Sequence, residues 1–158
     1  MLRLTKKADY GLIAVKHLAE RVGSGVPQAC SAKDLAGEYS IPQEALAKIL
    51  QRLTRKGLLI STQGANGGYI LARSPAQISL LEVIRAIEGP LFITTCFTAR
   101  VCEQSGSCTI REPLRKVNET LAGFLEKITI ADVCDGAEAA LDKDLVRIAG
   151  TPHPLHAV

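Results

Sequence analysis

Apolar residues recur at three- and four-residue steps along much of the chain, which is the spacing of amphipathic helices. Two of these stretches begin at Thr5 and Ser31, residue types that favour a helix N-terminus. A third begins at Pro42, a residue suited to the first helical position, and ends before Gly57. The predicted helices span residues 4–21, 31–36, 42–56 and 79–88.

The segment after the third helix has the pattern of a β-hairpin. Two short β-prone runs, residues 58–62 and 69–72, flank a turn rich in Gly and Asn. Three helices followed by a hairpin predict a winged helix-turn-helix. The expected fold is therefore mainly α, with this domain in residues 1–73 and a connecting helix in residues 74–90.

The second half of the chain has a loop followed by one long amphipathic helix. Residues 91–111 contain three cysteines among Thr, Ser and Gly, and residues 112–135 are predicted to be a dimerisation helix segment, with the helix itself running from about Glu112 to Ile128. Because little else remains to cover its apolar stripe, a partner copy is expected to do so in a two-fold homodimer. The alternative is that this helix folds back on its own domain. Residues 136–158 are expected to form a loose tail.

Charge is unevenly distributed along the chain. Residues 1–72 contain ten Lys or Arg and five Asp or Glu, whereas the remainder is slightly acidic. A basic first half is a modest sign of a polyanionic partner. The beginning of the chain lacks the apolar run of a signal peptide, and no window is apolar enough to span a membrane. A cytoplasmic protein is expected, in which five cysteines favour a metal or redox role over structural disulfides.

The third helix would be the recognition helix, which a helix-turn-helix places in the major groove of double-stranded DNA. The side chains expected to reach base edges are Gln43, Glu44 and Lys48. Those expected to contact phosphates are Arg52, Arg55 and Lys56, with Gln63 and Asn66 as the polar side chains of the wing tip. A protein-contacting role for this domain is the alternative, which the basic bias disfavours.

Three cysteines, Cys96, Cys102 and Cys108, are spaced six residues apart in the loop. Zinc sites more often show cysteine pairs two residues apart, with a further Cys or His nearby. Three thiolates on a loop suit an iron–sulfur cluster whose last ligand comes from elsewhere. The alternatives are unliganded thiols or a thiol redox sensor. Cys30 and Cys134 are expected to pack as small apolar side chains.

These features resemble the Rrf2 family of regulators. The resemblance rests on the opening Leu-Arg-Leu-Thr-Lys, the Gly-Gly-Tyr of the wing at residues 67–69, and the three evenly spaced cysteines, and it covers about residues 1–135. It implies a dimeric winged-helix protein with a [2Fe–2S] or [4Fe–4S] cluster. Such proteins control genes for cluster assembly, nitric oxide response or related metabolism.

The ligand set varies within that family, and this chain departs from one of its patterns. In the IscR pattern a His follows the third cysteine by three residues, where this chain has Arg111. In the NsrR pattern a carboxylate of the partner subunit's first helix completes the cluster, and Asp9 occupies the matching position. The alternative for Asp9 is an ordinary first-turn acid. Gln63 and Ala47 replace an Arg and a Glu of the IscR pattern, so its DNA site does not carry over.

The sequence thus predicts a transcription regulator that senses an iron–sulfur cluster and binds operator DNA as a homodimer. The run from Asp9 to Leu12 looks most like regulators encoded with SUF assembly genes, which are the expected targets. One alternative is a metal-free thiol-sensing regulator, and another is an electron-transfer or cluster-carrier protein with a winged helix. No catalytic constellation is present, so an enzyme is not expected.

Overall fold

The first three helices form the base of the fold in a computed structural model, which describes residues 4–22, 24, 29–64, 67–94, 97 and 102–135. The Thr5 hydroxyl accepts a hydrogen bond from the Lys7 amide and caps the first helix, and Ser31 caps the second through the amide of Asp34. The third helix begins one residue later than predicted, because Pro42 is its N-cap. The three helices are α1 (Lys6–Glu20), α2 (Ala32–Glu38) and α3 (Gln43–Arg55).

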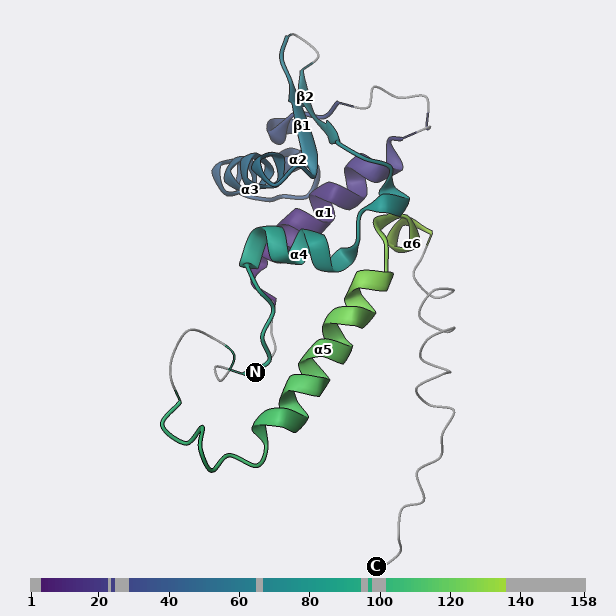
Figure 1. The fold of residues 1–158 in the computed structure, drawn as a ribbon. Coiled ribbons are helices and arrows are strands. Elements are labelled where there is room, and N and C mark those ends of the chain that lie inside the picture. The colour runs from purple at the N-terminus through teal and green to yellow at the C-terminus, as the bar shows by residue number, and fades with distance from the viewer. Residues whose placement is uncertain are drawn as a thin grey trace, which may run out of the picture.

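A two-stranded antiparallel hairpin follows α3 and projects from one end of the molecule (Figure 1). Gly57 ends α3 with a φ of 74°, a left-handed conformation that glycine adopts without strain. Strand β1 (Leu59–Thr62) pairs with β2 (Gly68–Leu71), so that Leu59 lies opposite Leu71. The predicted mainly α fold with a winged helix-turn-helix is confirmed.

A single core joins these elements. Leu18 of α1, Leu35 of α2 and Leu50 of α3 are almost completely excluded from solvent, and each contributes about 1.5–3 kcal/mol to the free energy of folding. Cys30 is also buried, and Cys134 packs against the same core, as their small apolar side chains predict. No helix in the described part of the chain is both long and apolar enough to cross a lipid bilayer.

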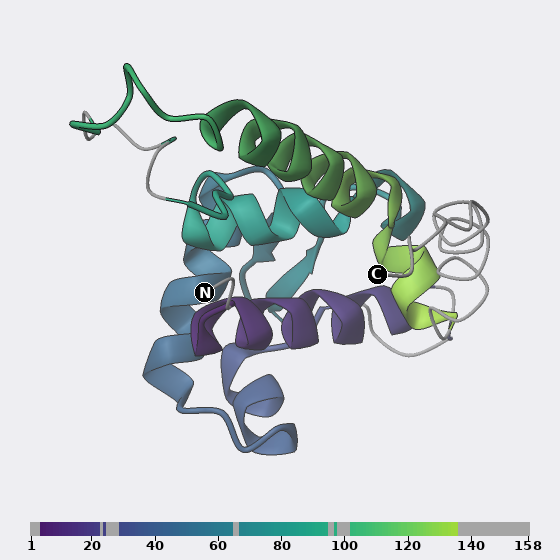
Figure 2. The same ribbon diagram turned by 90° about the horizontal axis from the view of Figure 1, so that it is seen from below.

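The connecting segment is more divided than the sequence indicates. It begins with a short 3-10 helix, η1 (Pro75–Gln77), and continues as α4 (Leu80–Glu88). Viewed from below, α4 lies between α1 and α5 (Arg111–Lys127) (Figure 2). The chain leaves α4 through Gly89, whose φ is 89°, and reaches α5 after the cysteine loop.

The predicted dimerisation segment 112–135 contains two helices: α5, which ends next to the predicted end at Ile128, and a second, short helix that the sequence did not predict. Ile128 is extended and ends α5, and Thr129 then caps α6 (Ile130–Cys134) in a capping box with Asp132. Backbone hydrogen bonds tie this break to the start of α4, because the amide of Leu80 donates to Ile128 and that of Ile130 donates to Ile78. The strong local capping signal of Thr129 is what separates the two helices.

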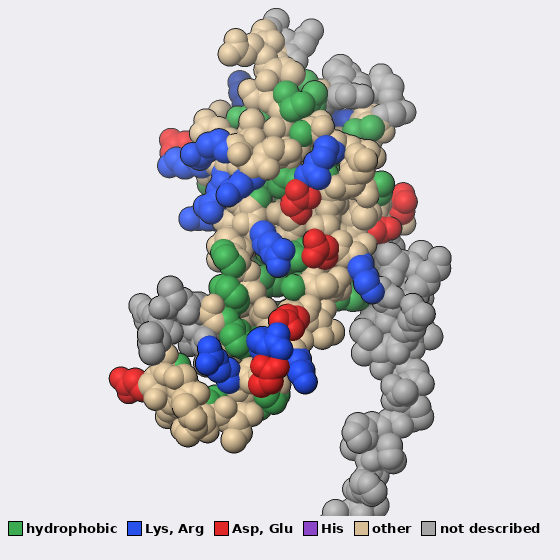
Figure 3. All heavy atoms as spheres, in the orientation of Figure 1, with side chains coloured by type: hydrophobic (Ala, Val, Ile, Leu, Met, Phe, Trp, Pro, Cys, Tyr) green, Lys and Arg blue, Asp and Glu red, His purple; other side chains and the backbone are tan. Residues whose placement is uncertain are grey.

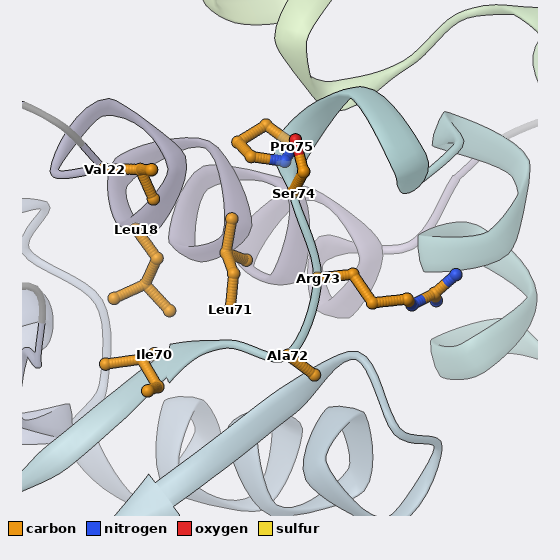
Figure 4. A pocket seen from close by; sticks show the side chains of 8 residues that line it. All are labelled: Leu18, Val22, Ile70, Leu71, Ala72, Arg73, Ser74 and Pro75. Carbon is orange, nitrogen blue, oxygen red and sulfur yellow. The ribbon is translucent and has the colours of Figure 1, made fainter.

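A small pocket of about 250 Å³ lies at the base of the hairpin (Figure 4). Leu18, Val22 and Leu71 give it apolar walls, whereas Arg73 points away from them toward α4. There Arg73 forms an ion pair with Glu82. The pocket therefore lies where the hairpin packs on α1.

Candidate nucleic-acid interface and cysteine loop

Helix α3 has sharply different faces. Its buried residues are Leu46, Ile49, Leu50 and Leu53, at the spacing of one helix face. The predicted DNA-contacting residues that the structure describes are all exposed: Gln43, Glu44, Lys48, Arg52, Arg55, Lys56 and Gln63. Asn66 lies outside the described residues.

Lys and Arg side chains gather on the side of the molecule where α3 lies (Figure 3). A groove of about 600 Å³ runs along this helix, with Lys48, Arg52 and Arg55 on α3 and Lys7 from α1 among its lining residues. Four cations against the single carboxylate of Glu44 give it a positive field that suits a phosphate backbone. Sequence reasoning missed Lys7, because only the packing of α1 beside α3 brings it to this groove.

A second hollow, of about 490 Å³, separates α3 from the hairpin. It is lined by Gln51, Thr54 and Arg55 of α3 and by Ser61 and Tyr69 of the two strands. This hollow adjoins the groove along α3, because Arg55 lines both the hollow and the groove. The recognition helix and the wing thus present one continuous polar surface.

The wing is held to the helical domain by close backbone contact at Gly68. Cys30 and Tyr69 exchange backbone hydrogen bonds of 3.1 and 2.9 Å. A Cβ atom at Gly68 would lie 2.5 Å from the carbonyl carbon and oxygen of Cys30, so no side chain fits there. The wing's glycine is therefore needed for close approach to the segment before α2.

Replacement of Gly68 by Ala is expected to lower the free energy of unfolding by about 1–3 kcal/mol, because the contacted backbone atoms cannot move aside. Urea unfolding followed by circular dichroism measures this change. The matched control is Gly37→Ala in α2, where an added Cβ meets nothing within 4 Å and should stabilise the protein by about 0.5–1 kcal/mol. Equal effects of the two variants would contradict the close-contact explanation.

The cysteine loop joins the end of α4 to the start of α5. Cys102 and Cys108 are free, half-buried thiols near the α5 end of this loop, whereas Cys96 lies outside the described residues. Burial raises the pKa of the Cys30 and Cys134 thiols, which favours the protonated form and makes them poor metal ligands. The two thiols of the core are thus distinct from those of the loop.

The residues that the structure describes do not by themselves complete a metal site. No three Cys, His, Asp or Glu side chains among them lie close enough together to hold a metal ion. Asp9 is exposed on the first turns of α1, where a neighbouring chain can reach it. Arg111 is the first residue of α5 and has no capacity to bind a metal.

One observation at the start of the loop fits an additional bound group. The Thr94 hydroxyl oxygen is buried and has no hydrogen-bond partner among the residues that the structure describes. Buried hydroxyls usually have a partner, which for Thr94 can be a water, a bound group or a residue outside the described ranges. Thiolate and sulfide sulfurs accept such bonds, and Thr94 lies two residues before Cys96. The donor set of the loop therefore fits an iron–sulfur cluster.

Comparison with known proteins gives one family. Residues 4–136 match the family described as "Rrf2: Iron-dependent Transcriptional regulator". The HTH-type transcriptional regulator IscR of Cronobacter sakazakii is 31% identical over 138 residues, which are 87% of this chain and 83% of that protein. These relatives are transcriptional regulators and not enzymes, as the sequence predicts.

Solved structures show the same architecture. The global cysteine regulator CymR of B. subtilis superposes with a TM-score of 0.70 at 27% identity, covering 85% of this chain and 98% of that one. IscR of T. potens gives a TM-score of 0.67 at 31% identity, covering 88% of this chain and 90% of that one. Both similarities extend over the winged domain and the helices that follow it.

Proposed function

The chain belongs to the Rrf2 family of transcriptional regulators, and from this premise we propose that it senses an iron–sulfur cluster and binds operator DNA as a homodimer. The observation that carries the proposal is the cysteine loop, with its free Cys102 and Cys108 thiols and a buried Thr94 hydroxyl that pairs with no described residue. The description of the family as iron-dependent and the similarity to IscR support it. The proposed target genes are those for SUF-type cluster assembly.

Cys96, Cys102 and Cys108 would hold the cluster through their thiolates, and Asp9 of the partner subunit would supply the remaining ligand. When bound, the cluster supplies a redox-active iron centre whose stability depends on iron supply and oxidants. The chain's own residues do the rest. The loop would present the thiols, the Thr94 hydroxyl would be available to donate a hydrogen bond to a sulfur, and the exposed face of α3 would contact DNA.

The distance between the loop and the wing bears on how sensing would work. The loop lies at the opposite end of the molecule from the hairpin (Figure 1). A change in the loop therefore has to reach the DNA-binding surface through the helices between them. Only a difference in DNA affinity between the two states of the loop makes the protein a switch.

Anaerobic reconstitution with iron and sulfide tests this proposal. The full chain should become brown and take up iron, whereas Cys102→Ser and Cys108→Ser should each lose most of that iron, because a serine hydroxyl is a poor ligand for iron in a cluster. Native mass spectrometry reads the cluster composition and the subunit number together. The matched control is Cys134→Ser, whose thiol packs against the core and should retain full iron.

A colourless, iron-free wild-type protein from this preparation would refute the cluster. The second candidate function would then apply, a metal-free thiol sensor that switches by a disulfide among the loop cysteines. Its support is the presence of two free thiols in one loop, six residues apart, together with the structural similarity to CymR. Mass spectrometry of the oxidised chain distinguishes it, since a disulfide between loop cysteines lowers the mass by two hydrogen atoms. Asp9→Asn separately tests the proposed partner ligand by its iron content.

A further inference from the structure

The last turn of α4 contacts the N-terminus of α1 and the recognition helix, and it leads into the cysteine loop. Its last residue, Glu88, accepts two hydrogen bonds at one oxygen, Oε1. One comes from the backbone N–H of Thr5, at 3.3 Å, and the other from the hydroxyl of Thr5. Thr5 is the N-cap of α1, so Glu88 holds the beginning of that helix.

The contact between Glu88 and Thr5 takes the place of a hydrogen bond that a residue of α1 itself often makes. In a capping box, a Glu three residues after the N-cap accepts from the N-cap amide. In α1 that position is Ala8, which is buried and cannot do so, and Glu88 performs the same task from another helix. A carboxylate is unfavourable at the C-terminus of its own helix and favourable at the N-terminus of a neighbour. Glu88 therefore stabilises the N-terminus of α1, although it is the last residue of α4.

The two residues before Glu88 contact the recognition helix and α1. Arg52 of α3 donates a hydrogen bond from Nε to the Ala86 carbonyl, at 2.8 Å. Ile87 is buried against Gly11 of α1, where an added Cβ would lie 2.0 Å from Ile87 Cδ1 and 3.3 Å from Ile49 Cγ2. Three consecutive residues of one turn thus set the position of both α1 and α3.

The same turn leads directly into the cysteine loop. After Gly89 the chain turns away from α4, and the Ile93 amide donates to Asn118 Oδ1 of α5, at 3.0 Å. Thr94, whose buried hydroxyl lies at the beginning of the cysteine segment, is only six positions after Glu88. The connection between the loop and Glu88 is therefore short, and it is anchored to α5 at Ile93.

We propose that the last turn of α4, residues 86–88, transmits the state of the cysteine loop to the recognition helix within one subunit, with Glu88 and Arg52 as its positioning residues. This inference rests on the proposed function for the identity of the signal. The Arg52 side chain then has a structural task on α4, beyond the phosphate contact predicted from the sequence. The carbonyl of Ala86 lies in the last turn of α4, where the helix dipole favours a cation.

The test compares the dissociation constant of cluster-loaded and cluster-free full chain for a DNA duplex selected from a random library. Fluorescence anisotropy under anaerobic conditions gives the ratio of the two constants, expected to lie between about fivefold and a hundredfold for wild type. In Glu88→Ala the two dissociation constants should differ by no more than about twofold. Glu88→Gln keeps the accepting oxygen and should restore the wild-type ratio.

Two further variants separate positioning from charge. Glu82→Ala removes another carboxylate of α4, the one paired with Arg73, and should retain the wild-type ratio. Arg52→Lys keeps a cation for phosphate but lacks the Nε–H that reaches Ala86. It should lower the ratio without changing the salt dependence of DNA binding, which counts phosphate contacts.

Hydrogen–deuterium exchange on the metal-free chain provides a readout that needs no cluster. Glu88→Ala should speed amide exchange in the first turn of α1 and in α3, and Glu82→Ala should not. Unchanged exchange in α3 together with a wild-type ratio would overturn the inference. If the wild-type chain takes up no cluster, the proposed function fails. The inference is then tested by amide exchange in α3 alone. Faster exchange in Glu88→Ala supports the inference, and unchanged exchange overturns it.

Discussion

Replacement of Leu121 by Glu should convert the proposed homodimer into monomers and lower the affinity for operator DNA by about a hundredfold or more, because two half-sites would then no longer be bound together. No residue of α5 is buried within the single chain. Leu121 is half-buried on the apolar stripe, and Val117 of the same stripe is 55% exposed. A partner copy of α5 would cover this face, and a carboxylate placed within it would lose its hydration.

Size-exclusion chromatography with light scattering measures the subunit number, and fluorescence anisotropy measures DNA affinity. The matched control is Thr120→Glu, which adds the same charge one residue away at an exposed position of α5. That variant should remain dimeric. A wild-type monomer, or a Leu121→Glu protein that is still a dimer, would show that the stripe is not the dimer interface.

Replacement of both Arg55 and Lys56 by Ala should weaken DNA binding strongly and reduce its dependence on salt. Arg55 lines the groove along α3, Lys56 follows it at the end of that helix, and each phosphate contact contributes about 0.9 to the slope of log affinity against log salt concentration. The double variant should therefore lose almost two units of slope, and its affinity should fall by a similar factor for every sequence.

The control for this prediction is Lys116→Ala, an exposed cation on α5 remote from the recognition helix. It should leave the slope unchanged. Titrations at several salt concentrations give all the slopes from one duplex. A double variant with the wild-type slope would mean that other residues bind the phosphates, with Lys7 of the same groove the next to replace.

Local signals in the sequence predicted most of the helical elements correctly. Thr5, Ser31 and Gly57 mark helix ends through hydrogen bonds and backbone conformations that depend on immediate neighbours. The hairpin follows from two β-prone runs around a Gly-rich turn. The long helix α5 ends at Lys127, next to its predicted end at Ile128, whereas the short α6 was not predicted, although Thr129 and Asp132 are a local capping signal.

The sequence by itself determined the helical and hairpin elements, the exposed cationic face of α3 and the presence of three cysteines in one loop. Each of these features depends on residues close together in the chain. Only the tertiary structure decided which distant residues meet. It brought Lys7 into the groove of α3, and it placed Glu88 on the N-cap of α1, although 83 residues separate Glu88 from Thr5. Such contacts leave no period or motif in the sequence, because they arise from the packing of whole helices.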